Sequence, residues 1–236
     1  MTVLLACQPP TEEGCEGAQF LTSGQADSVI APVGARRFVR FGLNVEIWYP
    51  AEPGSAEGKT AKRYDLRDYL PPEERRKISD EENAWQECPC FDDLPIDAER
   101  GPYPVILFIH GTAAFSHQSA QTTAYWASQG FVVIAMDHSG IFLSDMLAMN
   151  IAPRQADDAR ELLAELRGFE RGFADLKGLV DLDRIAIAGH SAGGFALAEL
   201  GDEVGVQMLL PMAAAGTAGP AAKVFSLIMA AVDDQV

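Results

Sequence analysis

The fold is decided by the stretch Asp183-Arg184-Ile185-Ala186-Ile187-Ala188-Gly189-His190-Ser191-Ala192-Gly193-Gly194-Phe195. A short run rich in Ile and Ala ends in a Gly-x-Ser-x-Gly pattern, and a helix-compatible segment, 192–200, follows at once. This order predicts a strand, a tight turn and a helix, with Ser191 at the apex of the turn. Gly189 and Gly193 flank the serine where a Cβ would collide with the adjoining strand or helix. The turn exposes the serine hydroxyl and places the Ala192 amide near a helix N-terminus, where an oxyanion can be stabilised.

Five loosely specified residues can also match this pattern by chance. The position of the match, between a buried strand and a helix, favours the functional interpretation, in which Ser191 is a nucleophile.

Four further apolar runs predict strands that are covered on both faces, as in a parallel sheet. They span residues 104–109, 131–136, 206–210 and 224–230. An alanine-containing segment up to Gln129 predicts a helix that Gly130 stops. Residues 156–166 predict a second helix, with one apolar stripe opposite its charged side chains. Strands that alternate with helices in this way predict a mostly parallel, doubly wound α/β sheet.

Polar side chains follow several of these strands directly. In open α/β sheets the active site lies beyond the carboxyl ends of the strands. The residues at those ends are His110-Gly111-Thr112, Asp137-His138, Ser191 and Asp233. They are therefore the candidates for a site.

One globular domain is expected, at 28–236, preceded by a short tether at 1–27. The globular part opens with strand-like runs at 37–41 and 45–49, which predict an antiparallel hairpin. Residues 51–100 are charged and rich in Pro and Gly, and we interpret them as a surface excursion. This segment could be a solvated linker, which the composition favours, or it could form a wall of a substrate cleft.

The 236 residues carry a formal net charge of −16. That charge argues against nucleic acid or an anionic membrane surface as a partner. The chain shows no Gly-x-Gly-x-x-Gly dinucleotide motif, and the spacing of its cysteines and histidines is not that of a metal site. We therefore expect no cofactor and no metal.

The N-terminal run Leu4-Leu5-Ala6-Cys7 resembles a bacterial lipobox, whose cysteine is lipidated after cleavage. An ordinary disordered N-terminus is the alternative. If the lipobox is real, the protein is extracytoplasmic and anchored to a membrane through Cys7, and its reading frame starts upstream of Met1. Otherwise it is cytoplasmic. In an exported protein, Cys15 could form a disulfide with Cys88 or Cys90, but the sequence does not settle the pairing.

With these residues placed, the chain resembles the α/β-hydrolase superfamily from about residue 36 onward. Within it, the chain is most similar to dienelactone-hydrolase-like, platelet-activating-factor-acetylhydrolase-like and cutinase-like serine esterases. The motifs that carry the resemblance are Val45-Glu46-Ile47-Trp48-Tyr49-Pro50, Tyr103-Pro104-Val105-Ile106-Leu107-Phe108-Ile109-His110-Gly111, Gly130-Phe131-Val132-Val133-Ile134-Ala135-Met136-Asp137-His138 and Gly189-His190-Ser191-Ala192-Gly193-Gly194.

The resemblance implies a set of site residues. Ser191 is the nucleophile, and the amides of Thr112 and Ala192 form the oxyanion hole. Asp233 is the triad acid, with Asp234 as the second choice, because both follow the last apolar run. In such motifs the histidine at position 110 supports its loop, and His190 is expected to pack beside the turn.

The third member of such a triad is a histidine after Asp233, and this sequence has none beyond His190. His117 and His138 are poor substitutes by position. A serine without a base is a weak nucleophile. The simplest hypothesis is that the chain is truncated at its C-terminus and lacks the last strand and helix of the fold. A naturally inactive relative is the alternative.

The sequence thus predicts a serine hydrolase of carboxylic esters, impaired in the form given, whose substrate is a small-molecule ester. A non-catalytic protein that binds a ligand or partner through the same fold is the competing hypothesis. Acyl length, alcohol group and oligomeric state are left open, as is the choice between esterase, thioesterase and peptidase.

Overall fold

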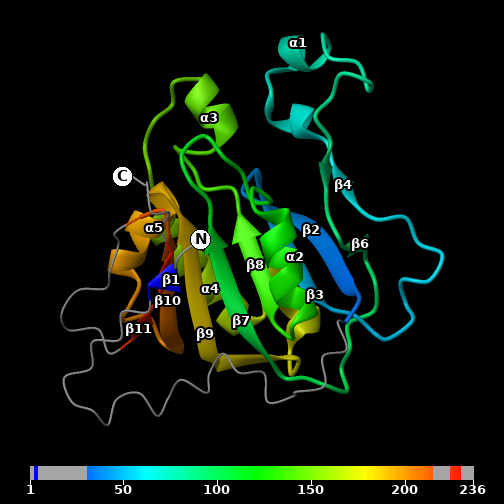
Figure 1. Cartoon of the computed structure of the whole chain (residues 1–236). Coiled ribbons are helices and arrows are strands. Elements are labelled where there is room, and N and C mark those ends of the chain that lie inside the picture. The colour runs from blue at the N-terminus through cyan, green and yellow to red at the C-terminus, as the bar shows by residue number, and fades with distance from the viewer. Residues whose placement is uncertain (1–2, 5–30, 215–223, 230–236) are drawn as a thin grey trace.

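A computed structural model of the chain, drawn in Figure 1, describes residues 3–4, 31–214 and 224–229. Four parallel strands form the middle of a ten-stranded sheet, in the spatial order β8-β7-β9-β10. Their bounds are β7 Tyr103–Ile109, β8 Val132–Met136, β9 Val180–His190 and β10 Val206–Met212. From β7 the chain continues to β8 on one side and then crosses to β9 on the other. Strand order therefore reverses at β7, which is where α/β sheets place their sites.

The predicted N-terminal hairpin is confirmed. It consists of β2 (Val33–Arg40) and β3 (Leu43–Pro50), which pair antiparallel, and β3 also pairs antiparallel with β8. The short strand β6 (Phe91–Asp92) extends the sheet beyond β2. At the opposite edge, the predicted run 224–230 contains the short strands β11 (Phe225–Ser226) and β12 (Ile228–Met229), and both pair with β10. Strand β1 (Val3–Leu4), from the start of the chain, pairs with β12.

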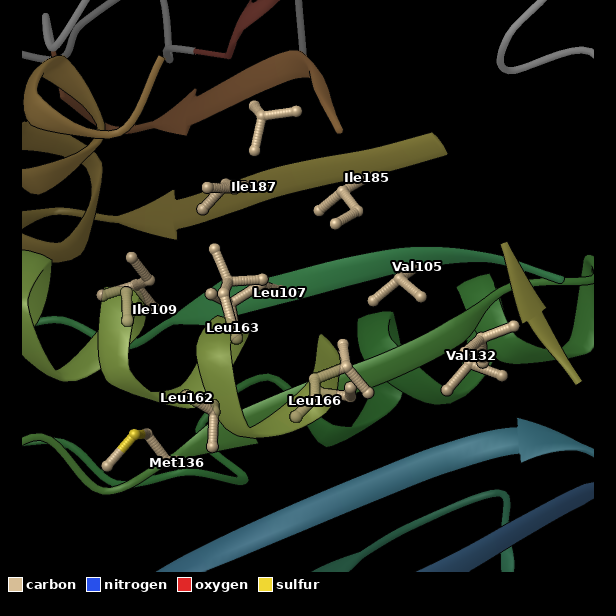
Figure 2. Packing of buried hydrophobic residues seen from close by; sticks show 14 of the residues in the cluster. Val105, Leu107, Ile109, Val132, Met136, Leu162, Leu163, Leu166, Ile185 and Ile187 are labelled. Atoms are coloured by element: carbon tan, nitrogen blue, oxygen red, sulfur yellow. The ribbon is translucent and has the colours of Figure 1, made fainter. Parts of the chain in front are cut away.

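Helices cover both faces of the sheet, as the predicted doubly wound fold requires. On one face, α4 (Gln155–Gly168) packs its apolar stripe against the sheet. Figure 2 shows this packing, in which Leu162, Leu163 and Leu166 face Val105, Leu107, Ile109, Val132, Met136, Ile185 and Ile187. The alternate residues of the same strands point to the other face, where α2 (Ala120–Ser128) packs. Because successive side chains of a strand alternate between two covered faces, β7, β8 and the 185–189 part of β9 are apolar throughout.

The face under α2 has smaller side chains than the face under α4. Ala186 and Ala188 of β9 lie there together with three alanines of α2, namely Ala120, Ala124 and Ala127. Small residues on both sides let the helix approach the sheet closely, and Phe108 and Trp48 fill the remaining volume. This explains why the alanine-containing segment is a core helix although it lacks a leucine stripe.

The excursion at 51–100 is packed on the sheet. It contains two short strands that pair with each other, β4 (Arg63–Tyr64) and β5 (Gln86–Glu87). Between them lie a 3₁₀ turn, η2 (Leu66–Tyr69), and a short helix, α1 (Pro72–Arg75). Its α1 end projects away from the sheet at the upper right of Figure 1. However, Tyr64, Tyr69 and Leu94 are buried. A solvated linker would expose such side chains, so that description does not fit this part of the chain.

Cys88 and Cys90 form a disulfide with each other. The predicted alternative, a bridge from Cys15 to one of them, is therefore wrong. The backbone explains the pairing, because the amide of Cys88 donates to the Lys62 carbonyl and the carbonyl of Cys90 accepts from the Lys62 amide. Both cysteines thus flank the same residue, and their Cα atoms lie 5.1 Å apart, within the range that a disulfide spans.

Three predicted features lie outside the described residues. They are the lipidation of Cys7, the cysteine at position 15, and the acid Asp233 with its alternative Asp234. Among the residues that are described, no helix combines the length and the apolar character that a membrane crossing requires.

Candidate active site

Ser191 lies at the apex of a sharp turn between β9 and helix α5 (Ala192–Ala196), as predicted. Its backbone angles, φ 52° and ψ −119°, belong to a region that residues with a side chain rarely adopt. The Ser191 amide donates to the Met212 carbonyl at 2.9 Å, which holds this backbone in place from the neighbouring strand β10. The helix continues as a 3₁₀ turn, η4 (Leu197–Glu199), in agreement with the predicted helical segment.

The glycines beside the serine are required by close approach. A Cβ on Gly189 would overlap the carbonyl of Gly193, and a Cβ on Gly193 would overlap the carbonyls of Ile109 and His110. The first turn of α5 therefore lies directly against the end of β7. This contact brings the segment after β7 to the serine.

The loop after β7, residues 110–116, which we name the oxyanion loop, passes immediately beside the turn. A Cβ on Gly111 would lie 3.2 Å from the Ser191 Cβ. Thr112, the next residue, is exposed. Ala113 adopts a left-handed φ of 55°, and its amide donates to the Ile141 carbonyl at 2.9 Å. The loop is thus fixed on one side by the turn and on the other by the segment after β8.

The two predicted oxyanion donors are the amides of Thr112 and Ala192. Thr112 directly follows Gly111, and Ala192 directly follows Ser191, and Gly111 and Ser191 lie in contact with each other. Within the described part of the chain, the Thr112 amide donates no hydrogen bond, and Ala192 opens α5, where amides have no partner within the helix. The oxyanion hole stays a prediction, and these positions are consistent with it.

His110 is buried and holds two loops together. Its Nδ1 donates to the Gly111 carbonyl at 2.7 Å, and its Nε2 accepts from the His138 amide at 2.9 Å. Burial lowers its pKa to about 3, so it is neutral at physiological pH. This agrees with the predicted supporting role.

His138 is also buried, and its Nδ1 lies 3.5 Å from Oδ2 of Asp158 on α4. The same carboxylate accepts from the Ser139 amide at 2.9 Å and from the Ser139 hydroxyl. Although burial opposes its charge, the adjacent His138 ring and the hydrogen bonds from Ser139 lower the pKa of Asp158 overall. This Asp–His pair anchors the segment after β8 to α4.

His117 packs between two tyrosines of the excursion. Its ring stacks on Tyr64 at a centroid distance of 4.0 Å and lies 5.5 Å from the Tyr69 ring, and its Nδ1 donates to Oε1 of Gln86 at 2.7 Å. Burial lowers its pKa to about 3. In the described residues, none of the four histidines forms a hydrogen bond with the Ser191 hydroxyl, so none is placed as its base.

Asp137, a candidate by its position after β8, has a structural role. Its Oδ2 accepts from the side chain of Asn44 at 2.7 Å, and its Oδ1 accepts from the Ser116 amide at 2.7 Å and from the Tyr69 hydroxyl at 3.3 Å. The carboxylate therefore joins β3, the oxyanion loop and the excursion.

Gln118 is a further residue of the site, which the sequence did not indicate. Its Oε1 accepts from the Gly111 amide at 3.0 Å, and its Nε2 donates to Nδ1 of His190 at 2.9 Å. His190 is half-buried beside the turn, as predicted. A glutamine in a polar segment before a helix carries no signal of such a role, since both of its partners are distant in sequence or lie on the backbone.

A hollow of about 410 Å³ lies elsewhere. Its lining includes Arg36, Tyr49 and Leu179. Leu179 precedes β9, whereas Ser191 follows it. This hollow therefore lies at the end of the strands opposite to the serine turn. The described residues contain no group of acidic, histidine or cysteine side chains that could hold a metal ion.

Comparisons with known proteins agree with this arrangement. A model of the chlorophyllase family matches residues 94–204, which include the oxyanion loop and the serine turn. A chlorophyllase type 0 of Chenopodium album is 34% identical in an alignment 112 positions long, which covers 42% of this chain and 30% of that protein. A ferulic acid esterase from Streptomyces cinnamoneus has a similar structure, with a TM-score of 0.52 and 17% identity over 82% of this chain and 62% of that chain.

The chain therefore spans less than two thirds of the length of each of these two proteins. The similarity to the esterase structure concerns the fold, and the match to the chlorophyllase family model covers the segment in which the nucleophile candidate lies. Together with the doubly wound sheet and the strained serine at the turn between β9 and α5, these matches show that the chain has the α/β-hydrolase fold.

Proposed function

We propose that the protein is a serine hydrolase that cleaves carboxylic esters through an acyl-enzyme on Ser191. The observation that carries the proposal is the backbone of Ser191, strained at φ 52° and ψ −119° and held at the carboxyl edge of the sheet against the oxyanion loop. Strain of this kind persists only where the surrounding structure enforces it, and it is typical of nucleophiles at strand–helix turns.

The chemistry follows from this geometry. The Ser191 oxygen attacks the acyl carbon while its proton passes to a base, and the carbonyl oxygen becomes an oxyanion near the Thr112 and Ala192 amides. Each backbone donor of this kind lowers the barrier by about 3 kcal/mol. The alcohol then leaves with the proton, and water releases the acid from the serine in a second attack of the same type.

The class of substrate rests on the relatives. One matched protein is named a ferulic acid esterase and the other a chlorophyllase. Thr112 is exposed on the oxyanion loop, and Ser191 is half-buried at the same edge of the sheet. A small-molecule ester whose acyl carbon can reach this edge is therefore the substrate that we propose, with no cofactor.

Turnover also requires a base for Ser191, and the described histidines are engaged elsewhere. The decisive test uses two proteins, the 236-residue chain and the product of the complete gene. We expect the gene product to hydrolyse p-nitrophenyl butyrate and to react with a fluorophosphonate probe at Ser191, as localised by mass spectrometry. The 236-residue chain is expected to do both at least 1,000-fold more slowly, as for the loss of one triad member.

The matched controls are Ser191→Ala, which should abolish labelling and hydrolysis, and Ser79→Ala, which alters an exposed serine of the excursion and should change neither. Rapid labelling of the 236-residue chain would show that these residues already contain the base.

The competing function is binding of a ligand or partner without catalysis. It would be favoured if the gene product neither reacts with the probe nor cleaves nitrophenyl esters of short or long acyl chains, provided that it is folded by circular dichroism.

A further inference from the structure

Gln118 connects the two segments that carry the predicted oxyanion donors. Its side-chain oxygen accepts from the Gly111 amide at 3.0 Å, and its side-chain nitrogen donates to His190 Nδ1 at 2.9 Å. Gly111 directly precedes Thr112, and His190 directly precedes Ser191. A single side chain is therefore bonded to both sides of the contact beside the nucleophile.

The chemistry of these bonds fixes the orientation of each group. A backbone amide can only donate, so the atom of Gln118 that faces Gly111 must be Oε1. The amide nitrogen then faces His190, and because a side-chain NH₂ can only donate, Nδ1 of His190 must accept. His190 is consequently held as the neutral tautomer with its proton on Nε2.

The position of Gln118 is itself fixed by the excursion. Nε2 of Gln86 donates to the carbonyl of His117 at 2.9 Å and to the carbonyl of Gln118 at 3.3 Å, while Oε1 of Gln86 accepts from the His117 ring. Gln86 lies on β5, two residues before the Cys88–Cys90 disulfide. The backbone of Gln118 therefore does not depend on the bonds that its side chain makes.

We propose that Gln118 is a positioning residue that sets the separation between the Thr112 and Ala192 amides, and so the geometry of the oxyanion hole. This proposal rests on the proposed ester hydrolysis. Donors to an oxyanion act over a narrow range of distance, and a displacement of about 1 Å near the reacting atoms can cost roughly 100-fold in rate. A residue bonded to both donor segments is suited to limit such a displacement.

The test compares Gln118→Leu, Gln118→Glu and Gln121→Leu in the product of the complete gene. Leu removes both bonds, and we expect kcat to fall roughly 10- to 100-fold with KM changed less than about threefold, because an oxyanion forms only in the transition state. Gln121, in the first turn of α2 just after Gln118, is the matched control, since among the described residues its side chain donates to the Glu87 carbonyl alone, at 2.9 Å. Its variant should retain wild-type kcat.

Gln118→Glu separates positioning from simple support of the fold. The carboxylate still accepts from the Gly111 amide but can pair with His190 only if Nδ1 carries a proton. We expect ¹⁵N NMR of the 236-residue chain to show the Nε2–H tautomer of His190 in the wild type and a proton on Nδ1 in this variant. A wild-type proton on Nδ1 would overturn the bonding on which the proposal depends.

The two proposals fail in different ways. If wild-type Ser191 neither reacts with the fluorophosphonate nor supports hydrolysis, the proposed function fails, and the positioning role fails with it whatever the tautomer. If Ser191 is active but Gln118→Leu keeps kcat within twofold of the wild type, only the positioning role is wrong.

Discussion

Nε2 of His110 accepts a hydrogen bond of 2.9 Å from the backbone amide of His138. This bond joins the loop after β7 to the segment after β8, at the edge of the sheet where Ser191 lies. The acceptor must be an unprotonated nitrogen, and the other ring nitrogen of His110 already donates to the Gly111 carbonyl. The junction therefore exists only with a neutral His110.

The first prediction concerns acid. Burial lowers the pKa of His110 to about 3, whereas an unfolded histidine titrates near 6.5, so the unfolded state binds the extra proton between these values. The stability contributed by the neutral ring is complete above about pH 6.5 and is lost as pH falls toward 3. Between pH 7 and pH 5 this amounts to about 2 kcal/mol of unfolding free energy.

Urea denaturation of the wild type and of His110→Asn at both pH values isolates this contribution. His117, whose pKa burial also lowers, and Glu46, whose pKa burial raises, titrate in both proteins and cancel in the difference. The variant should lose about 2 kcal/mol less than the wild type on acidification. An equal loss in the two proteins would mean that His110 is not held neutral.

The second prediction concerns strain at the nucleophile. Glycine adopts φ 52° and ψ −119° at little cost, whereas alanine keeps the Cβ that makes this backbone unfavourable. We expect Ser191→Gly to be more stable than Ser191→Ala by about 1–2 kcal/mol, although glycine usually destabilises folded proteins. Thermal unfolding of the two inactive variants measures the difference, and the reverse order would show that the turn is unstrained.

Much of the fold could be predicted because its signals are local. The apolar run at 104–109 has no polar position, which identifies a strand buried on both faces, and the glycines around Ser191 are placed where close approach requires them. The turn, the hairpin and the oxyanion loop follow from such patterns.

The rest depends on partners that are distant in sequence. Tyr69 and Gln86 lie in a charged, proline-rich segment, and only tertiary contacts with Asp137 and His117 make them structural. The pairing of Cys88 with Cys90 depends on hydrogen bonds to the backbone of Lys62, and the spacing of cysteines in the sequence carries no information about these bonds. Gln118 belongs to the same class, since its role consists entirely of bonds to Gly111 and His190.

The third prediction concerns the disulfide. Cys88 and Cys90 are separated by two positions, so the bridge closes a very short loop and restricts the unfolded chain little. Chain entropy gives about 1.5 kcal/mol for such a loop, about half of the value for a 15-residue loop. The free energy of unfolding, measured by urea denaturation, should therefore be about 1–2 kcal/mol lower for the double variant Cys88→Ala/Cys90→Ala than for the wild type.

Both sulfurs are buried, so dithiothreitol should reduce the folded protein slowly. The control is the unfolded protein, in which reduction should be fast. Equal rates of thiol release, measured by alkylation and mass spectrometry, would indicate that this part of the excursion opens freely.

The fourth prediction concerns the contact between the excursion and the oxyanion loop. The ring of Tyr69 stacks on Phe115 at a centroid distance of 4.6 Å, and its hydroxyl donates to Asp137 at 3.3 Å. Tyr69→Phe keeps the stack and removes the hydroxyl, which bonds Asp137 and, at 3.5 Å, the Ser116 hydroxyl, so it should cost about 1 kcal/mol. Tyr69→Ala also removes a buried ring and should cost about 3–5 kcal/mol.

A double-mutant cycle of Tyr69→Ala with Phe115→Leu isolates the stack, for which we expect a coupling free energy of about 0.5–1.5 kcal/mol. Because Phe115 lies on the oxyanion loop, Tyr69→Ala should also lower kcat/KM in the product of the complete gene, whereas Tyr69→Phe should not. The matched control is Tyr125→Ala, an exposed tyrosine of α2. A coupling near zero with unchanged kcat/KM would mean that the excursion packs on the loop without restraining it, and would leave the loop fixed by His110, Gln118 and Asp137.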